Sequence, residues 1–304
     1  MNNELTRRGL IIKGIGGLYT VRTADGDIVC KARGKFRISD IKPMVGDNVA
    51  IKIQPDDSGV TWEIETRKND LVRPALANLD RLIVIASEAP PITDKFLIDK
   101  VTAIAGHKGI EIIVCINKCD LAPGEELERI YKSAGFMVIK TSAKTGQGID
   151  EIKSIVTQGI TALTGNSGVG KSSIIRHLKP NKDIPVGALS EKIGRGKQTT
   201  KHVELFELTE GRYIADTPGF QSFDVERMDL VLKDDLQHAF IDFAPFIPDC
   251  RFTSCTHIKE KGCAVRKAVK KGEIEESRYG SYIMLYESMK EINEWELKKQ
   301  ERND

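Results

Sequence analysis

The order of five short motifs between residues 114 and 220 is the feature that most constrains the fold of this 304-residue chain. Read from the N-terminus, they are Asn117-Lys118-Cys119-Asp120, Ser142-Ala143-Lys144, Gly165-Asn166-Ser167-Gly168-Val169-Gly170-Lys171-Ser172, Thr199-Thr200 and Asp216-Thr217-Pro218-Gly219. Together they are the parts of a guanine-nucleotide site. An ordinary GTPase places the phosphate loop first and the guanine-reading motifs last, whereas here the guanine readers come first. The order therefore predicts a circularly permuted GTPase domain.

The third motif has the pattern of a phosphate-binding loop, in which two glycines bracket four residues and Lys and Ser follow. The glycines let backbone N–H groups converge on phosphates at the N-terminus of the helix expected over 172–178. Lys171 is predicted to reach the β- and γ-phosphates, and the Ser172 hydroxyl to bind Mg²⁺. We include Ser173 among the nucleotide contacts. The alternative is a glycine-rich turn that caps a helix, but the strand expected over 159–163 favours the phosphate site.

The first two motifs are predicted to read the guanine base. The first follows an apolar stretch, 112–116, that is typical of a buried strand. The Asp120 carboxylate can accept hydrogen bonds from guanine N1–H and the exocyclic amine, a pair that adenine does not offer. We expect Asn117 and Lys118 to brace the base and the neighbouring loops. Ser142-Ala143-Lys144 is expected to form a second guanine-contacting loop. The alternative for both motifs is a pair of ordinary strand-to-helix turns.

The last two motifs are predicted to sense magnesium and the γ-phosphate. Asp216 follows a strand-like segment, so that its carboxylate can hold Mg²⁺ through water, and the Gly219 amide can sense the γ-phosphate. Thr199 or Thr200 is the candidate for the threonine that closes on Mg²⁺ in the GTP state. The alternative for this threonine pair is a solvated loop.

The residue that orients the attacking water is not evident. Ras-like enzymes have a Gln directly after the last glycine, whereas this chain has Phe220, whose side chain cannot orient water. Either a partner completes the site or another residue supplies the function, and the nearby polar candidates are Gln198 and His202. The predicted catalytic set is Lys171, Gln198, Thr199, Thr200 and His202.

The N-terminal region, residues 1–70, reads as a small β-barrel. Apolar and β-branched stretches alternate with turn signals that contain Gly, Pro and Asp. The expected strands are 10–13, 18–22, 27–33, 48–53 and 61–65. Five short strands in this length predict an OB-fold, with an SH3-like barrel as the alternative.

After Pro74 the pattern changes to alternating strands and helices. The expected strands are 82–86, 112–116, 137–139, 159–163, 203–208 and 213–215, and the expected helices are 96–105, 125–134, 149–157 and 172–178. This alternation predicts a parallel sheet covered by helices on both faces, in a GTPase domain over 71–227. The polar segment 182–201 is expected to be a mobile loop.

Three of the six cysteines, Cys250, Cys255 and Cys263, fall within 14 residues, beside His257. In a cytosolic protein such a cluster indicates a metal rather than disulfides. Three thiolates and one imidazole suit a tetrahedral structural zinc, which would supply roughly 10–16 kcal/mol to a segment that is poor in large apolar residues. The spacing is not that of a standard finger, and the alternative is buried unpaired cysteines. We assign residues 228–304 to a helical zinc-binding domain, with a final helix at 282–299.

Basic residues concentrate in the same region: Arg251, Lys259, Lys261, Arg266, Lys267, Lys270 and Lys271. The last four share one helix face by their three- and four-residue spacings, and that face suits a phosphate backbone. The alternative is a solvated charged helix. A second cationic segment, 31–37, lies in the expected barrel. Two cationic modules around one GTPase favour an RNA partner.

With these motifs in this order, the chain resembles the ribosome small-subunit-dependent GTPase A family of bacteria over nearly its whole length. The family combines an OB-like barrel, a permuted GTPase domain and a Cys-Cys-His-Cys zinc module. The resemblance implies that Cys250, Cys255, His257 and Cys263 are the zinc ligands. It also implies binding near the decoding region of the small subunit, late in maturation, and stimulation of GTP hydrolysis by that subunit. Many relatives have His where this chain has Gln198, so a catalytic role of that histidine does not carry over.

Composition narrows the remaining possibilities. The longest apolar runs, such as 82–86, are far shorter than the ~20 residues of a membrane helix, and the N-terminus lacks the apolar core of a signal peptide. The net charge of +2 argues neither for nor against nucleic acid. We therefore expect a monomeric cytoplasmic protein, without a membrane partner, that binds GTP or GDP, Mg²⁺ and one structural Zn²⁺.

A nucleotide-dependent switch is the mechanism that the permuted order suggests. We hypothesise that γ-phosphate contacts at Gly219 and at Thr199 or Thr200 order the neighbouring loops and reposition the zinc module on the rRNA of the small subunit. Hydrolysis would then release the protein. The alternatives are a permuted GTPase of large-subunit assembly, a constitutive RNA-binding protein with a structural nucleotide site, and a metabolic GTPase without ribosome contact.

Overall fold

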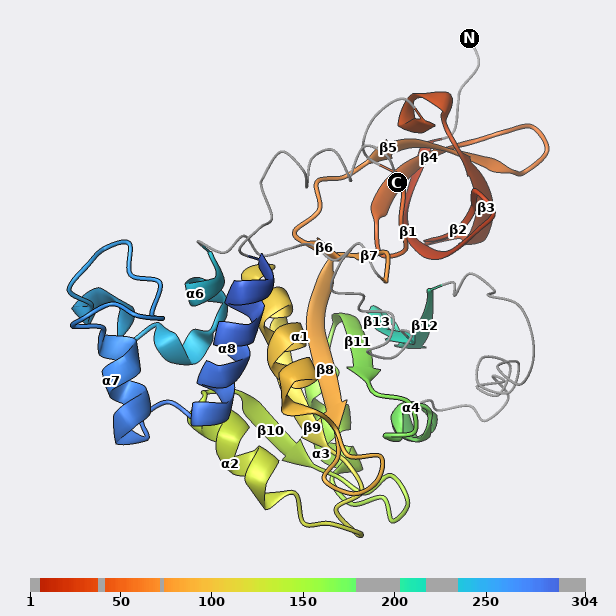
Figure 1. Ribbon diagram of the computed structural model, residues 1–304. Helices are drawn as coiled ribbons and strands as arrows, with labels where there is room; N and C mark the ends of the chain where they lie inside the picture. The colour runs from red at the N-terminus through yellow and green to blue at the C-terminus, as the bar shows by residue number, and fades with distance from the viewer. Residues whose placement is uncertain (1–5, 38–41, 72–73, 179–202, 217–234, 290–304) are drawn as a thin grey trace, which may run out of the picture.

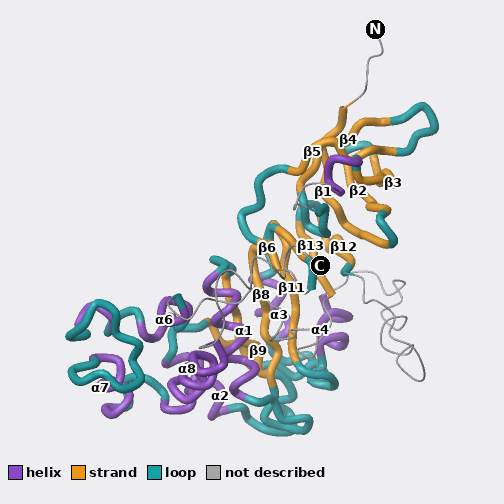
Figure 2. The backbone as a smooth tube through the Cα atoms, turned by 45° about the horizontal axis from the view of Figure 1, so that its top comes forward, coloured by secondary structure: helices purple, strands orange, loops and turns teal. Residues whose placement is uncertain are grey.

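The computed structural model describes residues 6–37, 42–71, 74–178, 203–216 and 235–289. A β-barrel and a small helical module lie at opposite ends of a central sheet with its helices (Figures 1 and 2). The strands of the barrel and of the central sheet form one continuous hydrogen-bonded series. None of the described helices is both long and apolar enough to cross a membrane.

The N-terminal barrel is OB-like, as the sequence predicted. Its strands are β1 (Thr6–Ile15), β2 (Leu18–Thr23), β3 (Gly26–Ala32), β4 (Asn48–Ile53) and β5 (Gly59–Ile64), and η1 (Gly34–Arg37) follows β3. They pair in the order β1-β2-β3-β5-β4, and β4 closes onto β1. The parallel pairing of β3 with β5 favours this fold over the SH3-like alternative. Closure buries an apolar interior that includes Ile11, Val21 and Ile51.

The central sheet has the order β10-β9-β8-β11-β13-β12. Its strands are β8 (Leu79–Ala86), β9 (Glu111–Ile116), β10 (Met137–Lys140), β11 (Gly159–Gly165), β12 (Glu204–Thr209) and β13 (Arg212–Asp216). The sheet is parallel as expected, except that β12 runs antiparallel to β13. The two-residue connection 210–211 explains the exception, because a parallel crossover needs a dozen residues or more. An unforeseen short hairpin, β6 (Asp70–Leu71) and β7 (Leu76–Ala77), precedes β8.

Helices cover both faces of the central sheet (Figure 2). These helices are α1 (Lys95–His107), α2 (Glu125–Ser133), α3 (Ile149–Ile155) and α4 (Lys171–Leu178). Along β8, Leu82, Val84 and Ala86 pack in the cluster that contains α1 and α2 residues. Ile83 and Ile85 pack in the cluster that contains α3 and α4 residues. An apolar run on a central parallel strand therefore fills two cores at once.

The C-terminal module is built from four short helical segments and the longer helix α8. They are α6 (Leu236–Ala239), η4 (Ile241–Phe243), η5 (Ile247–Asp249), α7 (Ala264–Lys271) and α8 (Glu276–Met289). The module has an aromatic core, since the Tyr282 ring lies 4.9 Å from that of Phe243 and 5.4 Å from that of Phe240. The expectation of few large apolar residues around the cysteines was therefore wrong. The last helix also begins six residues before the predicted start at 282, and residues 290–299 lie outside the described part.

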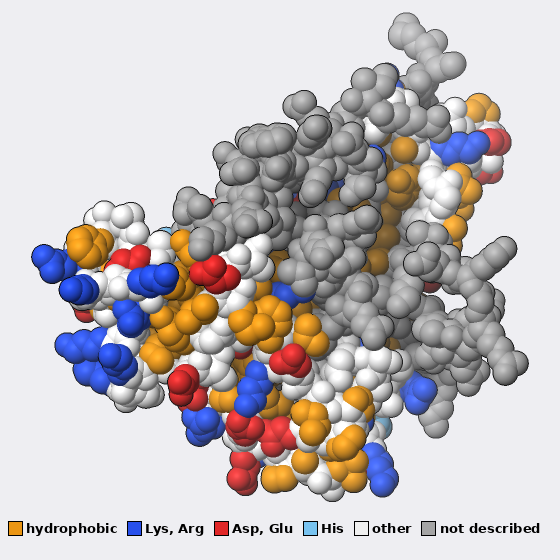
Figure 3. Space-filling model, viewed as in Figure 1, with side chains coloured by type: hydrophobic (Ala, Val, Ile, Leu, Met, Phe, Trp, Pro, Cys, Tyr) orange, Lys and Arg blue, Asp and Glu red, His pale blue; other side chains and the backbone are white. Residues whose placement is uncertain are grey.

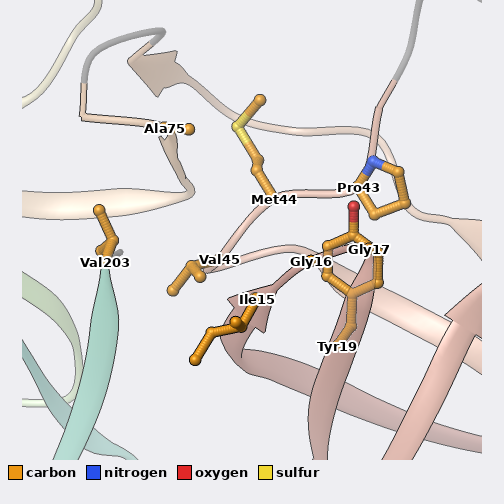
Figure 4. Close-up of a pocket in the computed structure, with 10 residues that line it drawn as sticks. Ile15, Gly16, Gly17, Tyr19, Pro43, Met44, Val45, Ala75 and Val203 are labelled. Atoms are coloured by element: carbon orange, nitrogen blue, oxygen red, sulfur yellow. The ribbon is translucent and has the colours of Figure 1, made fainter. Parts of the chain in front are cut away.

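The barrel joins the central sheet through β1 and β12. Lys13 of β1 pairs with Glu204 of β12 across the strands, and their side chains form an ion pair at 3.0 Å. Arg22 of β2 also pairs with Glu207 of β12. A cavity of about 230 Å³ opens at this joint, lined by side chains such as Ile15, Tyr19, Met44 and Val203 (Figure 4).

A buried ion triad joins the C-terminal module to the central domain. The guanidinium of Arg278 on α8 donates to Asp242 at 2.6 and 2.9 Å and to Asp99 of α1 at 2.8 Å. Tyr131 of α2 donates to the same Asp99 oxygen at 3.0 Å. Residues of four elements, α1, α2, η4 and α8, thus meet at one charged centre. The domain boundaries at 70/71 and 227/228 stay a prediction.

Candidate nucleotide site and metal site

Sequence motifs follow the carboxyl ends of four parallel strands. Asn117 comes directly after β9, and Ser142 lies two residues after β10. The loop 165–172 joins β11 to α4, and Asp216 ends β13. From the central β8, the chain builds β9 and β10 on one side and β11 and β13 on the other. Ligands of open α/β sheets bind outside the carboxyl ends at such a reversal, so the topology brings the motifs to one edge.

Asn117 connects the guanine-reading loops to the phosphate loop. Its side chain is 2% exposed, and its Nδ2 donates to the Val169 carbonyl at 2.8 Å. Its Oδ1 accepts from the Ala143 N–H at 3.0 Å and from the Thr141 hydroxyl at 3.2 Å. A Cβ on Gly170 would lie 2.1 Å from Asn117 Nδ2, so the glycine is required for this approach. The position of one buried amide therefore fixes three loops relative to one another.

The side chain of Asp120 is exposed, and a neighbouring hydroxyl orients it. Ser142 Oγ donates to Asp120 Oδ1 at 2.7 Å and accepts from the Thr145 N–H at 3.2 Å. Lys118 has a left-handed backbone (φ +65°), and its ammonium donates to the Pro90 carbonyl at 2.7 Å. A carboxylate held in one orientation suits recognition of a purine edge with two neighbouring donors.

The phosphate loop has the geometry that its glycines allow. Gly168 and Gly170 have φ values of +76° and +108°, which L side chains rarely adopt. The Lys171 ammonium donates to the Gly165 and Asn166 carbonyls at 2.9 and 3.3 Å. Lys171 is the first residue of α4, so the loop ends on the N–H groups of a helix N-terminus, which favour anions.

Several predicted residues lie elsewhere. Lys144 is exposed in the same turn as Ser142, and Ser173 lies in the first turn of α4. The predicted mobile loop 182–201 and the residues Gln198, Thr199, Thr200, His202, Gly219 and Phe220 lie outside the described residues. Their roles, like those of all the nucleotide contacts, stay predictions.

The segment 87–94 also borders the site and carries none of the five motifs. It follows β8, contacts Lys118 through the Pro90 carbonyl, and contacts Asn166 through Thr93 and the Pro91 carbonyl. The signal that could have identified it is positional. A segment at the carboxyl end of the central strand lies where ligands of such sheets bind.

Cys250, Cys255, His257 and Cys263 come together, with their ligand atoms all within 4.8 Å of one another. His257 Nδ1 lies 3.6 Å from Cys250 Sγ and 3.4 Å from Cys263 Sγ, and these two sulfurs are 4.0 Å apart. A tetrahedral zinc with bonds of about 2.0–2.3 Å separates its ligands by roughly 3.5–3.8 Å. The three distances lie within about 0.2 Å of these values, so Cys250, His257 and Cys263 fit one tetrahedral ion, and the Cys255 sulfur lies within 4.8 Å of each of them as the candidate fourth ligand.

The surroundings of the cluster also fit a cation. His257 Nε2 bonds to Gln237 Oε1 at 2.8 Å, so that Nδ1 faces the sulfurs. In many metal sites a hydrogen bond to the other ring nitrogen orients the histidine ligand in this way. The N–H groups of Ala264 and Arg266 donate to Cys250 and Cys263 at 3.3 and 3.4 Å.

The pKa shifts in the cluster follow from the burial of its residues. Burial raises the pKa of the Cys255 and Cys263 thiols and lowers the pKa of His257. The imidazole is therefore held in the neutral form that binds metals. Burial disfavours the charged thiolate form of cysteine, and a bound cation would offset this cost.

The loop between the ligands is held by a carboxylate and a tyrosine. Partial burial tends to raise the pKa of Glu260. Hydrogen bonds from Thr256 and from backbone N–H groups outweigh this effect and lower the pKa to about 2. The Tyr279 hydroxyl donates to the His257 carbonyl at 2.6 Å. His257 has a left-handed φ of +62°, a costly conformation that these contacts stabilise.

Cationic side chains mark the module and the barrel. The α7 helix exposes Lys267, Lys270 and Lys271, and Figure 3 shows Lys and Arg side chains gathered at the end of the molecule where α7 lies. Arg266 is half-buried and donates to the Glu260 carbonyl at 3.3 Å. On the barrel, Arg33 and Lys52 lie 3.6 and 3.5 Å from the ring centre of Trp62.

The permuted order of the loops and their meeting at one edge of a parallel sheet define a circularly permuted GTPase. The RsgA GTPase family matches residues 64–226, and the RsgA N-terminal domain matches residues 8–61. The chain belongs to the RsgA GTPase family. As a member it is a GTPase that binds GTP and GDP with Mg²⁺.

Curated relatives resemble the chain over most of its length. The protein called small ribosomal subunit biogenesis GTPase RsgA of Caldanaerobacter subterraneus subsp. tengcongensis is 42% identical, covering 93% of this chain and 96% of its own. The protein of the same name from Clostridium botulinum is also 42% identical, covering 95% of this chain and 100% of its own.

Two solved structures share the whole architecture. YjeQ from Thermotoga maritima aligns with a TM-score of 0.79 and 34% identity, covering 95% of this chain and 100% of its own. YloQ, described as a circularly permuted GTPase, aligns with a TM-score of 0.75 and 31% identity, covering 95% of this chain and 97% of its own.

Proposed function

We propose that this GTPase binds the small ribosomal subunit through its rRNA, assists late maturation of the subunit, and leaves after GTP hydrolysis that the subunit stimulates. The observation that carries the proposal is the likeness, over more than nine-tenths of the chain, to relatives named small ribosomal subunit biogenesis GTPase. The cationic surfaces on the barrel and on α7 support it, since both suit a phosphate backbone. We propose that the protein acts as a monomer in the cytoplasm.

In the proposed nucleotide site, Asp120 reads the guanine edge, supported by Ser142 and Asn117. Lys171 neutralises the β- and γ-phosphates, and the amides of loop 165–172 bind their oxygens. Ser172 and Asp216 would hold Mg²⁺, which would supply positive charge to the phosphates. The water-orienting group comes from Gln198, His202 or the bound subunit.

In the proposed metal site, Cys250, Cys255, His257 and Cys263 hold one structural Zn²⁺. The four ligand atoms converge, and Gln237 and two backbone N–H groups support three of the ligands. A closed set of four ligands stabilises the fold and leaves no position for catalysis. The ion would fix the loop that presents α7 to RNA.

Nucleotide state is proposed to control release. The buried contact of Arg278 with Asp99 holds α8 against α1. We propose that the described part of the zinc module follows α1 when α1 moves. Contacts of Gly219 and of Thr199 or Thr200 with the γ-phosphate would shift the zinc module together with α1. They would also shift β12, to which the barrel is attached.

Co-sedimentation with separated ribosomal subunits tests the proposed function. With a non-hydrolysable GTP analogue, the wild-type protein should pellet with small subunits, and it should do so less with GDP. Lys171→Ala should abolish this nucleotide dependence, because it removes the charge that contacts the phosphates.

Other outcomes would identify the alternatives. Preferential binding to large subunits would indicate a role in large-subunit assembly, and equal binding with and without the analogue would indicate a constitutive RNA-binding protein. Binding to neither particle at low salt would favour a metabolic GTPase.

A further inference from the structure

The segment 87–94 forms a closed turn whose residues 90–92 are exposed, while Ser87 and Thr93 on either side of them are buried. Ser87 is fully buried and Thr93 is 4% exposed. The Thr93 N–H donates to the Ser87 carbonyl at 2.9 Å, and the Ser87 N–H donates to Thr93 Oγ1 at 3.0 Å. Ser87 Oγ also bonds to the backbone of Ala89 in both directions, at 2.9 and 3.0 Å. The next residue, Asp94, caps α1 by accepting from the Phe96 N–H. The turn is therefore anchored at both ends.

The hydroxyl of Thr93 has one proton, and the contacts determine where it goes. Because Thr93 Oγ1 accepts from the Ser87 N–H, its own proton is available for Asn166 Oδ1, 2.7 Å away. The Asn166 amide is then oriented with Nδ2 toward the Pro91 carbonyl, at 3.3 Å. Both ends of this amide are thus engaged by the segment 87–94.

Asn166 is the second residue of the phosphate loop, and its backbone takes part in the shape of that loop. Its carbonyl accepts from the Val169 N–H and from the Lys171 ammonium, both at 3.3 Å. Two residues on, a Cβ placed on Gly168 would meet the Pro91 ring at 3.3 Å. The outer edge of the phosphate loop therefore rests on the segment 87–94.

We propose that Thr93 is a positioning residue for nucleotide binding, which acts through Asn166 to hold the phosphate loop in its anion-binding shape. The inference rests on the proposed role of loop 165–172. Holding the phosphate loop in its binding shape strengthens only the contacts that this loop makes with the nucleotide. Loss of the Thr93 hydroxyl should therefore weaken binding of GDP and GTP alike and leave guanosine, which has no phosphate, unaffected.

Thr93→Val tests the proposal, with Thr93→Ser as the matched control. Valine keeps the volume and removes the hydroxyl, whereas serine keeps the hydroxyl. Calorimetry with Mg²⁺ should show GDP and GTP dissociation constants raised roughly 3- to 10-fold in the valine variant, as for the loss of one buried hydrogen bond. The serine variant should bind like the wild type. Guanosine, measured by competition with a fluorescent GDP analogue, should bind all three proteins equally.

Three outcomes would overturn the proposal. They are unchanged GDP affinity in Thr93→Val, an equal loss for guanosine and GDP, and an equal loss in the serine and valine variants. If the wild-type protein bound no GDP, the proposed nucleotide site would fail instead, so the two failures are distinguishable.

A second variant approaches the same contact from the phosphate loop. Asn166→Ala removes a half-buried side chain on the loop, so it tests the contact even if Thr93→Val does not fold. It should weaken GDP binding by a similar factor. In the double variant with Thr93→Val the losses should not add, because both changes remove one hydrogen bond. Fully additive losses would contradict the proposal.

Discussion

Arg278→Met should separate the zinc module from helix α1. The Arg278 side chain is 1% exposed and lies between carboxylates of Asp99 and Asp242 that are 0% and 5% exposed. Methionine fills much of the same volume but leaves two buried negative charges without a partner. Removing one member of a buried ion pair typically costs about 3–5 kcal/mol, so we expect a loss of this size in the local opening free energy of α1 and α8.

The loss should depend on pH in a defined direction. Burial raises the pKa of Asp99, and the Arg278 charge is the main opposing influence, so the variant should raise that pKa further. A carboxyl whose pKa is higher in the folded state than in the unfolded state binds more protons when folded. Its unfavourable contribution grows as pH rises above the unfolded value of about 3.9. The deficit of Arg278→Met should therefore be larger at neutral pH than in mild acid.

Native-state hydrogen exchange of the α1 and α8 amides measures the effect, since a protein of several parts does not unfold as one unit. Arg129→Met is the matched control. Arg129 also pairs across the joint, with Glu275, but it is 61% exposed, and such pairs contribute about 0.2–1 kcal/mol. Adding Asp99→Asn and Asp242→Asn to Arg278→Met should recover part of the loss. A loss no larger than that of Arg129→Met would refute the reasoning.

Three further predictions concern the metal, the base and the RNA. Cys255→Ser should reduce bound zinc below one equivalent in metal analysis. It should also lower the hydrogen-exchange protection of the C-terminal module. Wild-type protein that is purified without zinc would contradict the site. Asp120→Asn should weaken GTP binding by roughly 10²- to 10⁴-fold, since two hydrogen bonds to a charged acceptor are lost, and equal affinity in a nucleotide titration would exclude that role. Lys267→Ala and Lys270→Ala should each lower the logarithmic salt dependence of small-subunit binding by about one; an unchanged slope would remove α7 from the interface.

The parts of the site that local chemistry encodes could be predicted from the sequence. Loop 165–172 and Asn117 each follow an apolar strand, and the carboxyl ends of parallel strands meet at one edge. The cysteine cluster was evident because metal ligands are few and close in sequence. Each of these features can be predicted from residues that lie close together in the sequence.

The joints between the parts could not be predicted, because they depend on contacts across long sequence separations. Arg278 lies in a charged, helical stretch that reads as a solvated surface, yet it is buried against Asp99, 179 residues earlier. The segment 87–94 has the composition of an ordinary turn, and its role is visible only from the contact between Thr93 and Asn166. The pairing of Lys13 with Glu204 likewise depends on β1 extending beyond the barrel.

The central claim is that loops in permuted order assemble one guanine-nucleotide site. Isothermal titration of the folded protein with GDP, GTP and ATP in the presence of Mg²⁺ tests it most directly. We predict one binding site that accepts GDP and GTP and strongly disfavours ATP. Absence of binding to either guanine nucleotide, or a preference for ATP, would contradict the account.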